Sequence, residues 1–358
     1  MALLEVDDLH VSFSTQDGVL RAVRGVSFTV EAGQTLGIVG ESGSGKSVST
    51  QTIIGLTKGA RVSGSARFEG TELLQASEAD LRRIRGVQIG MIFQDPLSSL
   101  HPQYRVGWQI TEMIRAHEPV TKKQARARAV ELLGLVGIPA PARRVDDYPH
   151  QFSGGMRQRA MIAMALALNP KLLIADEPTT ALDVTVQAQI LRLIKRLQQE
   201  FGTAVILITH DLGVIADIAE RVVVMYAGKL MEYAGKRTLY HEPHHPYTEG
   251  LIGSLPQRGT RRELLSSIPG QPPSLLRVPS GCPFHPRCGY VMRRCLTDAP
   301  PVQQVDGGAE HLSACWLPPD VTGTSDSSAA RRREAATREA LSTSGAQPVP
   351  ARDGSVTR

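Results

Sequence analysis

Eight residues near the start of the chain carry the clearest chemical signal in the sequence. A loop of the pattern G-x-x-x-x-G-K-S turns successive backbone N–H groups toward phosphate oxygens, and the helix that follows adds further donors. In this pattern the lysine reaches the β- and γ-phosphates, and the serine hydroxyl ligates Mg²⁺. The residues that fill it are Gly40, Glu41, Ser42, Gly43, Ser44, Gly45, Lys46 and Ser47.

The flanking residues agree with a phosphate loop. The apolar run 36–39 predicts a buried strand, and the stretch that starts at Val48 and runs to Leu56 predicts a helix. Strand, glycine loop and helix are the order that this loop requires, whereas a flexible glycine–serine turn, the alternative, needs neither neighbour. We therefore expect residues 40–47, called the P-loop below, to bind a nucleotide triphosphate.

Two adjacent carboxylates end another apolar run. Residues 171–177 predict a buried strand whose last two members are Asp176 and Glu177. Successive strand residues face opposite ways, so one carboxylate can face a metal and the next a water molecule. We expect Asp176 to bind Mg²⁺, directly or through water, and Glu177 to be the general base for water attacking the γ-phosphate. An acidic strand end that only caps the next segment is the alternative.

Two other polar side chains follow predicted strands. Gln94 comes directly after the strand 88–93, and His210 comes directly after the strand 203–209. The carboxyl ends of parallel strands form the ligand edge of an α/β sheet. Gln94 could there contact Mg²⁺ or the attacking water, and His210 could hold the γ-phosphate. Taken singly, a surface glutamine and a structural histidine are the ordinary interpretations.

A second anion site is indicated near residue 153. Ser153 can cap a helix that runs to about Leu168, which leaves the Gly154 and Gly155 amides at its positive end. Helix N-termini of this kind bind anions. An ordinary capped helix with a glycine entry explains these residues equally well.

The remaining pattern predicts the layers around this site. Residues 3–13 and 19–30 predict two strands joined by a hairpin turn at Asp17-Gly18, and Phe13 either packs under that sheet or stacks on an adenine ring. Residues 106–136 predict helices, with a capping box from Thr121 to Gln124. This helical insertion interrupts the α/β pattern and indicates a separate subdomain.

Composition excludes several classes of protein. The chain has 358 residues, a formal charge of +5 and 41% hydrophobic residues, and no apolar run approaches the length of a membrane span. Acidic residues near the N-terminus argue against an export signal, so we expect a cytoplasmic protein. The arginines are spread along the chain, which favours a solvated surface over a nucleic-acid groove.

With these motifs in order, residues 3–254 resemble the ATP-binding subunit of an ABC transporter. The resemblance implies an α/β P-loop NTPase fold with an antiparallel β layer, a helical subdomain and a small loop-rich C-terminal domain. It places the Walker A motif at 40–47, the Q-loop at Gln94, the signature loop at 152–156 and the Walker B motif at 172–176. It also implies that Glu177 is the catalytic glutamate, that 181–183 is the D-loop with Asp183 near nucleotide, that His210 is the switch histidine and that Phe13 stacks on adenine.

Finer motifs resemble the dipeptide/oligopeptide (and nickel) importer branch. These motifs are the stretches 93–100, 150–159 and 244–248. His101 departs from the asparagine that is common in that branch. The branch implies peptide import, with nickel, heme precursor or glutathione as alternative cargoes, because the cargo-binding residues belong to other subunits.

The family mechanism implies a particular set of partners. Two ATP-binding subunits, identical or paralogous, dimerise head to tail, so that Ser153, Gly154, Gly155 and Met156 act on the partner's nucleotide. Two transmembrane permease subunits and, indirectly, an extracytoplasmic substrate-binding protein complete the importer, which places this chain at the cytoplasmic face of the membrane. A soluble ABC ATPase acting on nucleic acid is the rival interpretation. The chain lacks the second nucleotide domain or long coiled coil usual in such proteins, so we expect no nucleic-acid partner.

All four cysteines lie in the C-terminal part of the chain with the spacing C-x5-C-x6-C-x19-C, and they are Cys282, Cys288, Cys295 and Cys315. Four thiolates suit zinc or an iron–sulfur cluster, and the wide early gaps are unlike those of structural zinc sites. The family resemblance implies a [4Fe-4S] cluster, with Zn²⁺ as the alternative.

These observations predict four regions. Residues 1–95 and 160–240 form the nucleotide-binding core, and 96–159 form the helical subdomain with the signature loop. Residues 241–320 form the C-terminal extension with the metal site, and 321–358 form a disordered tail that contains a short helix within 331–341.

Overall fold

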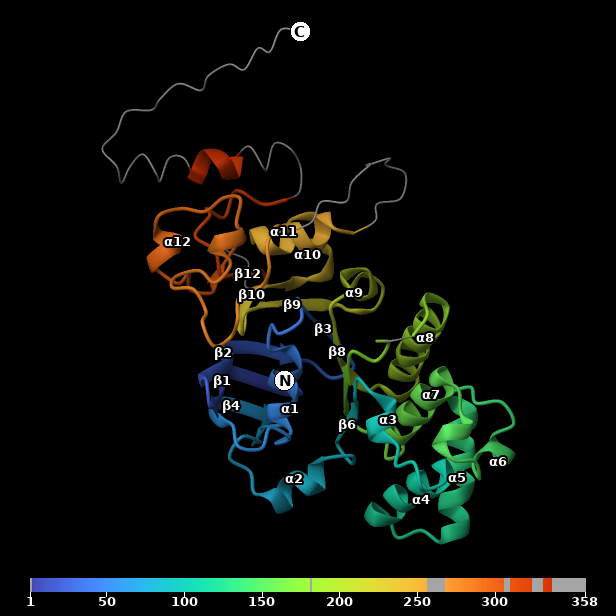
Figure 1. Cartoon of the computed structure of the whole chain (residues 1–358). Coiled ribbons are helices and arrows are strands. Elements are labelled where there is room, and N and C mark those ends of the chain that lie inside the picture. The colour runs from blue at the N-terminus through green and yellow to red at the C-terminus, as the bar shows by residue number, and fades with distance from the viewer. Residues whose placement is uncertain (1, 181, 256–267, 306–309, 324–330, 337–358) are drawn as a thin grey trace, which may run out of the picture.

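The computed structural model describes residues 2–180, 182–255, 268–305, 310–323 and 331–336 (Figure 1). It confirms the predicted fold class, an α/β nucleotide-binding core with an added antiparallel layer. That layer is a four-stranded sheet in the order β2-β1-β4-β5. Its strands are β1 (Leu4–Thr15), β2 (Gly18–Val30), β4 (Arg61–Phe68) and β5 (Thr71–Glu72).

The predicted hairpin is present, and its turn lies one residue earlier than expected. Residues 16 and 17 form the turn, and Gly18 is already the first residue of β2, paired with Thr15. Gly18 has φ +126°, a conformation that favours glycine. The glycine is therefore used at the first strand position and not inside the turn.

The second sheet holds the functional edge. Its strand order is β11-β12-β10-β9-β3-β8-β7-β6, and the five strands from β9 to β6 are parallel. The parallel strands are β3 (Thr35–Val39), β6 (Ile89–Ile92), β7 (Leu172–Asp176), β8 (Ala204–Thr209) and β9 (Arg221–Tyr226). Antiparallel β10 (Lys229–Gly235), β11 (Gln303–Gln304) and β12 (Leu312–Ser313) extend the sheet into the C-terminal part of the chain.

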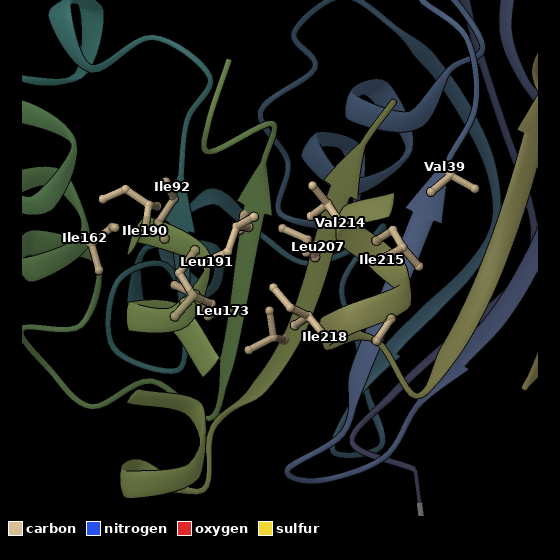
Figure 2. Close-up of a cluster of buried hydrophobic side chains, with 14 of the residues drawn as sticks. Val39, Ile92, Ile162, Leu173, Ile190, Leu191, Leu207, Val214, Ile215 and Ile218 are labelled. Carbon is tan, nitrogen blue, oxygen red and sulfur yellow. The ribbon is translucent and has the colours of Figure 1, made fainter. Parts of the chain in front are cut away.

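Both faces of the parallel strands are buried, and alternate residues separate two cores. Leu36 and Ile38 of β3 pack toward the antiparallel sheet, whereas Val39 packs on the helical side. On that side Leu173 and Leu207 meet the helices that cover the sheet (Figure 2). Near-continuous apolar strands are what a doubly covered parallel sheet requires, which explains why these runs were legible in the sequence.

Helices surround the core at three places (Figure 1). α1 (Lys46–Ile53) follows the P-loop, and α2 (Glu78–Ile84) lies between β5 and β6. Between β6 and β7 lie α3 (Pro96–Ser99), α4 (Val106–His117), α5 (Lys122–Leu135), α6 (Pro141–Arg144), the 3-10 turn η1 (Pro149–Gln151) and α7 (Gly154–Ala165). The remaining helices are α8 (Val184–Phe201), α9 (Leu212–Ile218), α10 (Lys236–His241), α11 (Pro246–Gly253), η2 (His285–Arg287) and α12 (Arg294–Thr297).

Local signals fix the ends of several helices. The predicted capping box is confirmed: the Thr121 hydroxyl accepts from the Gln124 N–H, and the Gln124 side chain accepts from the Thr121 N–H. α8 begins after Asp183, whose carboxylate accepts from the Val186 N–H at 2.9 Å, and it ends at Gly202 with φ +66°. Among the residues that the structure describes, no helix is long and apolar enough to cross a bilayer.

The C-terminal extension is held on the core by buried charges. Glu232 of β10 is fully buried and accepts hydrogen bonds from the His244 N–H at 2.8 Å and the His245 N–H at 2.9 Å, and it contacts His311 Nε2 at 2.8 Å. Arg332 lies in a short helix of residues 331–336, inside the stretch predicted to be disordered, and is also fully buried. It pairs with Glu249 and donates to the Pro243 carbonyl at 2.6 Å. The rest of the predicted tail lies outside the described residues, apart from residues 321–323. The region boundaries stay predictions.

The Glu232 cluster gives a prediction for stability and its pH dependence. Burial by itself would raise the pKa of Glu232, but hydrogen bonds from His311 and the His244 N–H outweigh it, and the pKa lies below its usual range. We expect Glu232→Gln to lower the free energy of unfolding by about 2 kcal/mol at neutral pH, because charge-assisted hydrogen bonds are lost. A carboxyl with a lowered folded-state pKa stabilises the protein fully above its unfolded pKa, about 4.3. The difference between wild type and variant should therefore shrink as the pH falls below about 4.

Urea unfolding followed by circular dichroism at several pH values measures this difference. Glu112→Gln, which removes one partner of an exposed ion pair with Arg115, is the matched control and should change stability by less than about 1 kcal/mol. Equal effects of the two variants at neutral pH would contradict the role given to Glu232.

Candidate functional site

A cleft of about 750 Å³ lies at the carboxyl edge of the parallel sheet. The loops that follow β3, β6, β7 and β8 all reach it, as expected from the strand ends in the sequence. Its described lining is Glu41, Ser42, Gly43, Ser44, Gly45, Lys46, Ser47, Val48, Gln94, Glu177, His210, Leu251 and Pro272. The structure thus brings together most of the predicted catalytic residues, and it adds two residues from the C-terminal part of the chain.

Close backbone packing explains the glycines of the P-loop. Gly40 has φ +156° and Gly45 has φ +96°, and a Cβ at either position would lie within 2.3 Å of a backbone oxygen, of Met225 and Ala22 respectively. Only glycine fits such an approach with such dihedral angles. The loop is therefore pressed against the neighbouring strands, with α1 starting at Lys46.

The lysine of the loop is buried at the base of the cleft. Its side chain donates to the carbonyls of Gly40 at 2.8 Å and Glu41 at 3.0 Å, and Lys46 is 4% exposed. Burial lowers the pKa of Lys46, and the carboxylates of Glu177 and Asp176 act in the opposite direction. The arrangement holds a poorly solvated cation where an anionic ligand would lie.

Oxygen ligands meet beside the lysine. Ser47 Oγ donates to Asp176 Oδ1 at 2.7 Å, and Gln51 Nε2 donates to Asp176 Oδ2 at 3.3 Å. Burial raises the pKa of Asp176, and the Ser47 hydrogen bond partly offsets this. A hydroxyl and a carboxylate already in contact are the hard oxygen donors that Mg²⁺ prefers, so these residues fit that ion.

The second carboxylate is the centre of a polar cluster. Glu177 Oε2 accepts from Gln94 Nε2 at 3.2 Å and from Thr180 Oγ1 at 2.9 Å, and His210 Nδ1 lies 3.5 Å from it. Glu177 has φ +45°, which is uncommon outside glycine, asparagine and aspartate. The strained backbone turns this side chain away from the direction of Asp176 and into the cleft.

The signature segment lies elsewhere. Ser153 Oγ accepts from the Met156 N–H at 3.3 Å and caps α7, as the sequence predicts. Ser153 and Gly154 are exposed, and the described residues that line the cleft do not include 153–156. Gln158 of the same helix is buried and donates to the Pro178 carbonyl at 2.6 Å, one residue after Glu177. This contact connects the signature helix to the catalytic carboxylate.

Two other predicted site residues also lie outside this lining. Phe13 is half-buried on β1 opposite Leu20 and packs against the core between the sheets. Asp183 is the N-cap of α8. Ala181, in the predicted D-loop, lies outside the described residues. The nucleotide contacts of Phe13 and Asp183 stay predictions.

The four cysteines line one small apolar cavity in the extension. Burial raises the pKa of Cys282 to about 11 and that of Cys288 to about 12, and it raises the pKa of the fully buried Cys315 further. Within the described residues, no three His, Cys, Asp or Glu side chains converge as ligands of a single ion. The thiols are therefore grouped around a shared space and not around one point.

Three contacts at the site escaped the sequence analysis. Gln51 stands one helical turn after Ser47, so a longer motif could have included it. Thr180 follows Glu177 by three residues. The contacts of Glu41 with Tyr247 and Arg287 join residues 206 and 246 positions apart, and no local pattern announces them.

Comparisons with known proteins identify this architecture. The family model of the ABC transporter matches residues 23–180, and that of the oligopeptide/dipeptide transporter C-terminal region matches residues 231–295. A solved dimeric, post-hydrolysis ATP-binding cassette bound to ADP and Pi has a TM-score of 0.60 and 28% identity, covering 65% of this chain and 99% of that one. The fold and the cleft are those of an ABC-type ATPase.

Two curated relatives define the branch. The oligopeptide transport ATP-binding protein OppD of Salmonella typhimurium is 52% identical over 318 residues, 88% of this chain and 94% of its own length. The dipeptide transport ATP-binding protein DppD of Escherichia coli is 48% identical over 325 residues, 90% of this chain and 99% of its own length. The chain therefore belongs to the ATP-binding proteins of the ABC transporter family, in the branch with the oligopeptide/dipeptide C-terminal region. The family resemblance inferred from the motifs is confirmed.

The geometry around Glu177 predicts separate effects on binding and hydrolysis. We expect Glu177→Gln to lower kcat for ATP about a hundredfold or more, because an amide cannot accept the proton of the attacking water. ATP affinity should stay within about threefold of wild type, since the amide keeps the size and contacts of the side chain. Steady-state ATPase assays with parallel equilibrium binding of labelled ATP measure both quantities. Glu242→Gln, an exposed position in the C-terminal extension, should leave both at wild-type values.

Proposed function

We propose that this chain hydrolyses Mg-ATP to drive import of dipeptides or oligopeptides through a membrane complex. The observation that carries the proposal is the meeting of Lys46, Glu177 and His210 in one cleft, on a chain that aligns over most of its length with peptide-transport ATP-binding proteins. Nickel, heme precursor and glutathione are the other cargoes that such machinery could serve.

Each residue at the cleft has a role in this proposal. Lys46 holds the phosphates, and Ser47, Asp176 and Gln94 hold Mg²⁺, which neutralises charge on the phosphate oxygens. Glu177 accepts the proton of the attacking water, and His210 holds the γ-phosphate. Phe13 stacks on adenine. The contacts of Ser47 with Asp176 and of Gln94 with Glu177 support this assignment.

The second anion site acts on a partner subunit. Ser153, Gly154, Gly155 and Met156, with Asp183, face the nucleotide held by a second ATP-binding subunit, a copy of this chain or a paralogue. Exposure of Ser153 and Gly154, away from the chain's own cleft, supports this arrangement. Two integral membrane subunits dock on the helical subdomain, and a substrate-binding protein outside the membrane delivers cargo. The chain is then peripheral at the cytoplasmic face and needs no nucleic acid.

Reconstitution of the complex tests this function. The full chain is purified with its integral membrane subunits and placed in liposomes that contain ATP. Labelled di- and tetrapeptides, nickel and glutathione are then offered on the opposite side. We expect ATP-dependent uptake of peptide only, and we expect Ser153→Arg to stop uptake while this chain still binds ATP at its own P-loop. Uptake of another cargo would replace the peptide assignment. Purification with nucleic acid and without membrane subunits would contradict the importer.

We infer further that Cys282, Cys288, Cys295 and Cys315 hold a [4Fe-4S] cluster. Burial of thiols around one cavity supports a thiolate-bound group, since a bound metal replaces the protons that these raised pKa values would otherwise retain. Wide separation of the sulfurs favours a cluster over a single Zn²⁺. Such a group would hold together this loop-rich segment.

Metal analysis of anaerobically purified protein checks the inference. We expect about four iron atoms per chain, a broad absorption band near 400 nm, and loss of both in Cys288→Ser. Ser280→Ala, at a position close in sequence to Cys282, is the control and should retain iron. One zinc and no iron would reassign the site to Zn²⁺, and metal-free protein that folds normally would remove it.

A further inference from the structure

The second residue of the P-loop is held from outside the nucleotide-binding core. The Glu41 N–H donates to the Tyr247 hydroxyl at 2.9 Å, and its carboxylate accepts two hydrogen bonds from Arg287, at 2.6 and 2.9 Å. Its carbonyl accepts from Lys46. Every polar group of Glu41 is thus engaged, and two of the three partners come from the C-terminal extension.

Arg287 is built into its position. Its side chain is 5% exposed, its Nε donates to the Pro269 carbonyl at 2.8 Å, and its Nη1 donates to the Tyr226 hydroxyl at 3.2 Å. The guanidinium also lies 5.7 Å from the centre of the Tyr226 ring and 6.0 Å from that of Phe284. Since a buried arginine stays protonated, the fork delivers a fixed positive charge to one carboxylate.

That carboxylate stands where negative charge is harmful. Glu41 lines the cleft and belongs to the loop that receives the triphosphate, and its side chain is 27% exposed. An unpaired carboxylate there would repel the phosphates across a partly desolvated gap, where charges interact more strongly than in bulk water. Bidentate pairing with Arg287 cancels this charge and leaves Lys46 as the net positive group.

We propose that Arg287 is a positioning residue for ATP: it neutralises Glu41, so that the C-terminal extension completes the P-loop. The proposal rests on ATP binding at this cleft. Arg287 directly precedes Cys288, and Pro272 and Leu251 also line the cleft. The segment that carries the cysteines is therefore joined to the nucleotide site by an ion pair across 246 residues.

A charge-deletion cycle tests the proposal in the full chain and in its membrane complex. The variants are Arg287→Met, Glu41→Gln with Arg287→Met, and Arg287→Lys. We expect Arg287→Met to raise the Kd and the KM for ATP about tenfold, with kcat at saturating ATP within about twofold of wild type. Removing the Glu41 charge as well should restore affinity to within about threefold. Arg287→Lys, which keeps the charge without the fork, should fall between wild type and Arg287→Met.

Salt and a matched control separate this effect from a structural one. The defect of Arg287→Met should shrink between 0.05 and 0.5 M NaCl, about as expected for screened repulsion. Arg126→Met breaks another bidentate pair, with Asp146 in the helical subdomain, and should leave the KM for ATP unchanged. Thermal unfolding of each variant accompanies the binding measurements.

Three outcomes would overturn the proposal: an unchanged KM in Arg287→Met, a double variant as weak as the single one, or a defect that is independent of salt. Should Arg287→Met fail to fold, a wild-type KM in Arg287→Lys would overturn it as well, and a raised KM that falls with salt would support it. Failure of the wild-type chain to bind ATP would instead remove the ATPase assignment on which the proposal rests.

Discussion

A buried ammonium group sets the requirements of the nucleotide site. Lys46 lies at the base of the cleft, and the loop's own carbonyls of Gly40 and Glu41 accept its hydrogen bonds. These carbonyls compensate for lost hydration until phosphate oxygens can take their place. Such a cation is tolerated only in a rigid surrounding, which is why the loop is pressed on Met225 and Ala22 and admits glycine alone at two positions.

The parallel sheet supplies that rigidity. β3, β7 and β8 are neighbours with apolar residues on both faces, so their register is fixed by two cores at once. The P-loop, Asp176 and His210 follow these three strands directly. Their relative positions are therefore set by core packing and not by loop conformation, and the strained backbone at Glu177 is stabilised from the same source.

The sequence predicted those parts that local physics determines. Apolar strands, the glycine loop, the capping box at Thr121 and the Ser153 cap each depend on residues within a few positions of one another, and the structure has all of them. The hairpin turn was displaced by one residue because Gly18 is used in the strand. Contacts set by tertiary packing, such as Arg287 with Glu41, could not be predicted, since many arginines and glutamates in the chain satisfy the same local pattern.

The C-terminal extension shares the electrostatic problem of the core. Glu232 and Arg332 are fully buried charges that pin the extension to itself and to β10, and such groups lose most of their stabilisation when a partner moves. The extension is thus unable to shift gradually: it is either seated with its ion pairs intact or displaced at the cost of several. Because Arg287 belongs to the seated arrangement, the charge beside the triphosphate depends on the whole extension being in place. A segment attached in this way is part of the ATP site, although it contributes no residue to the motifs by which such sites are recognised.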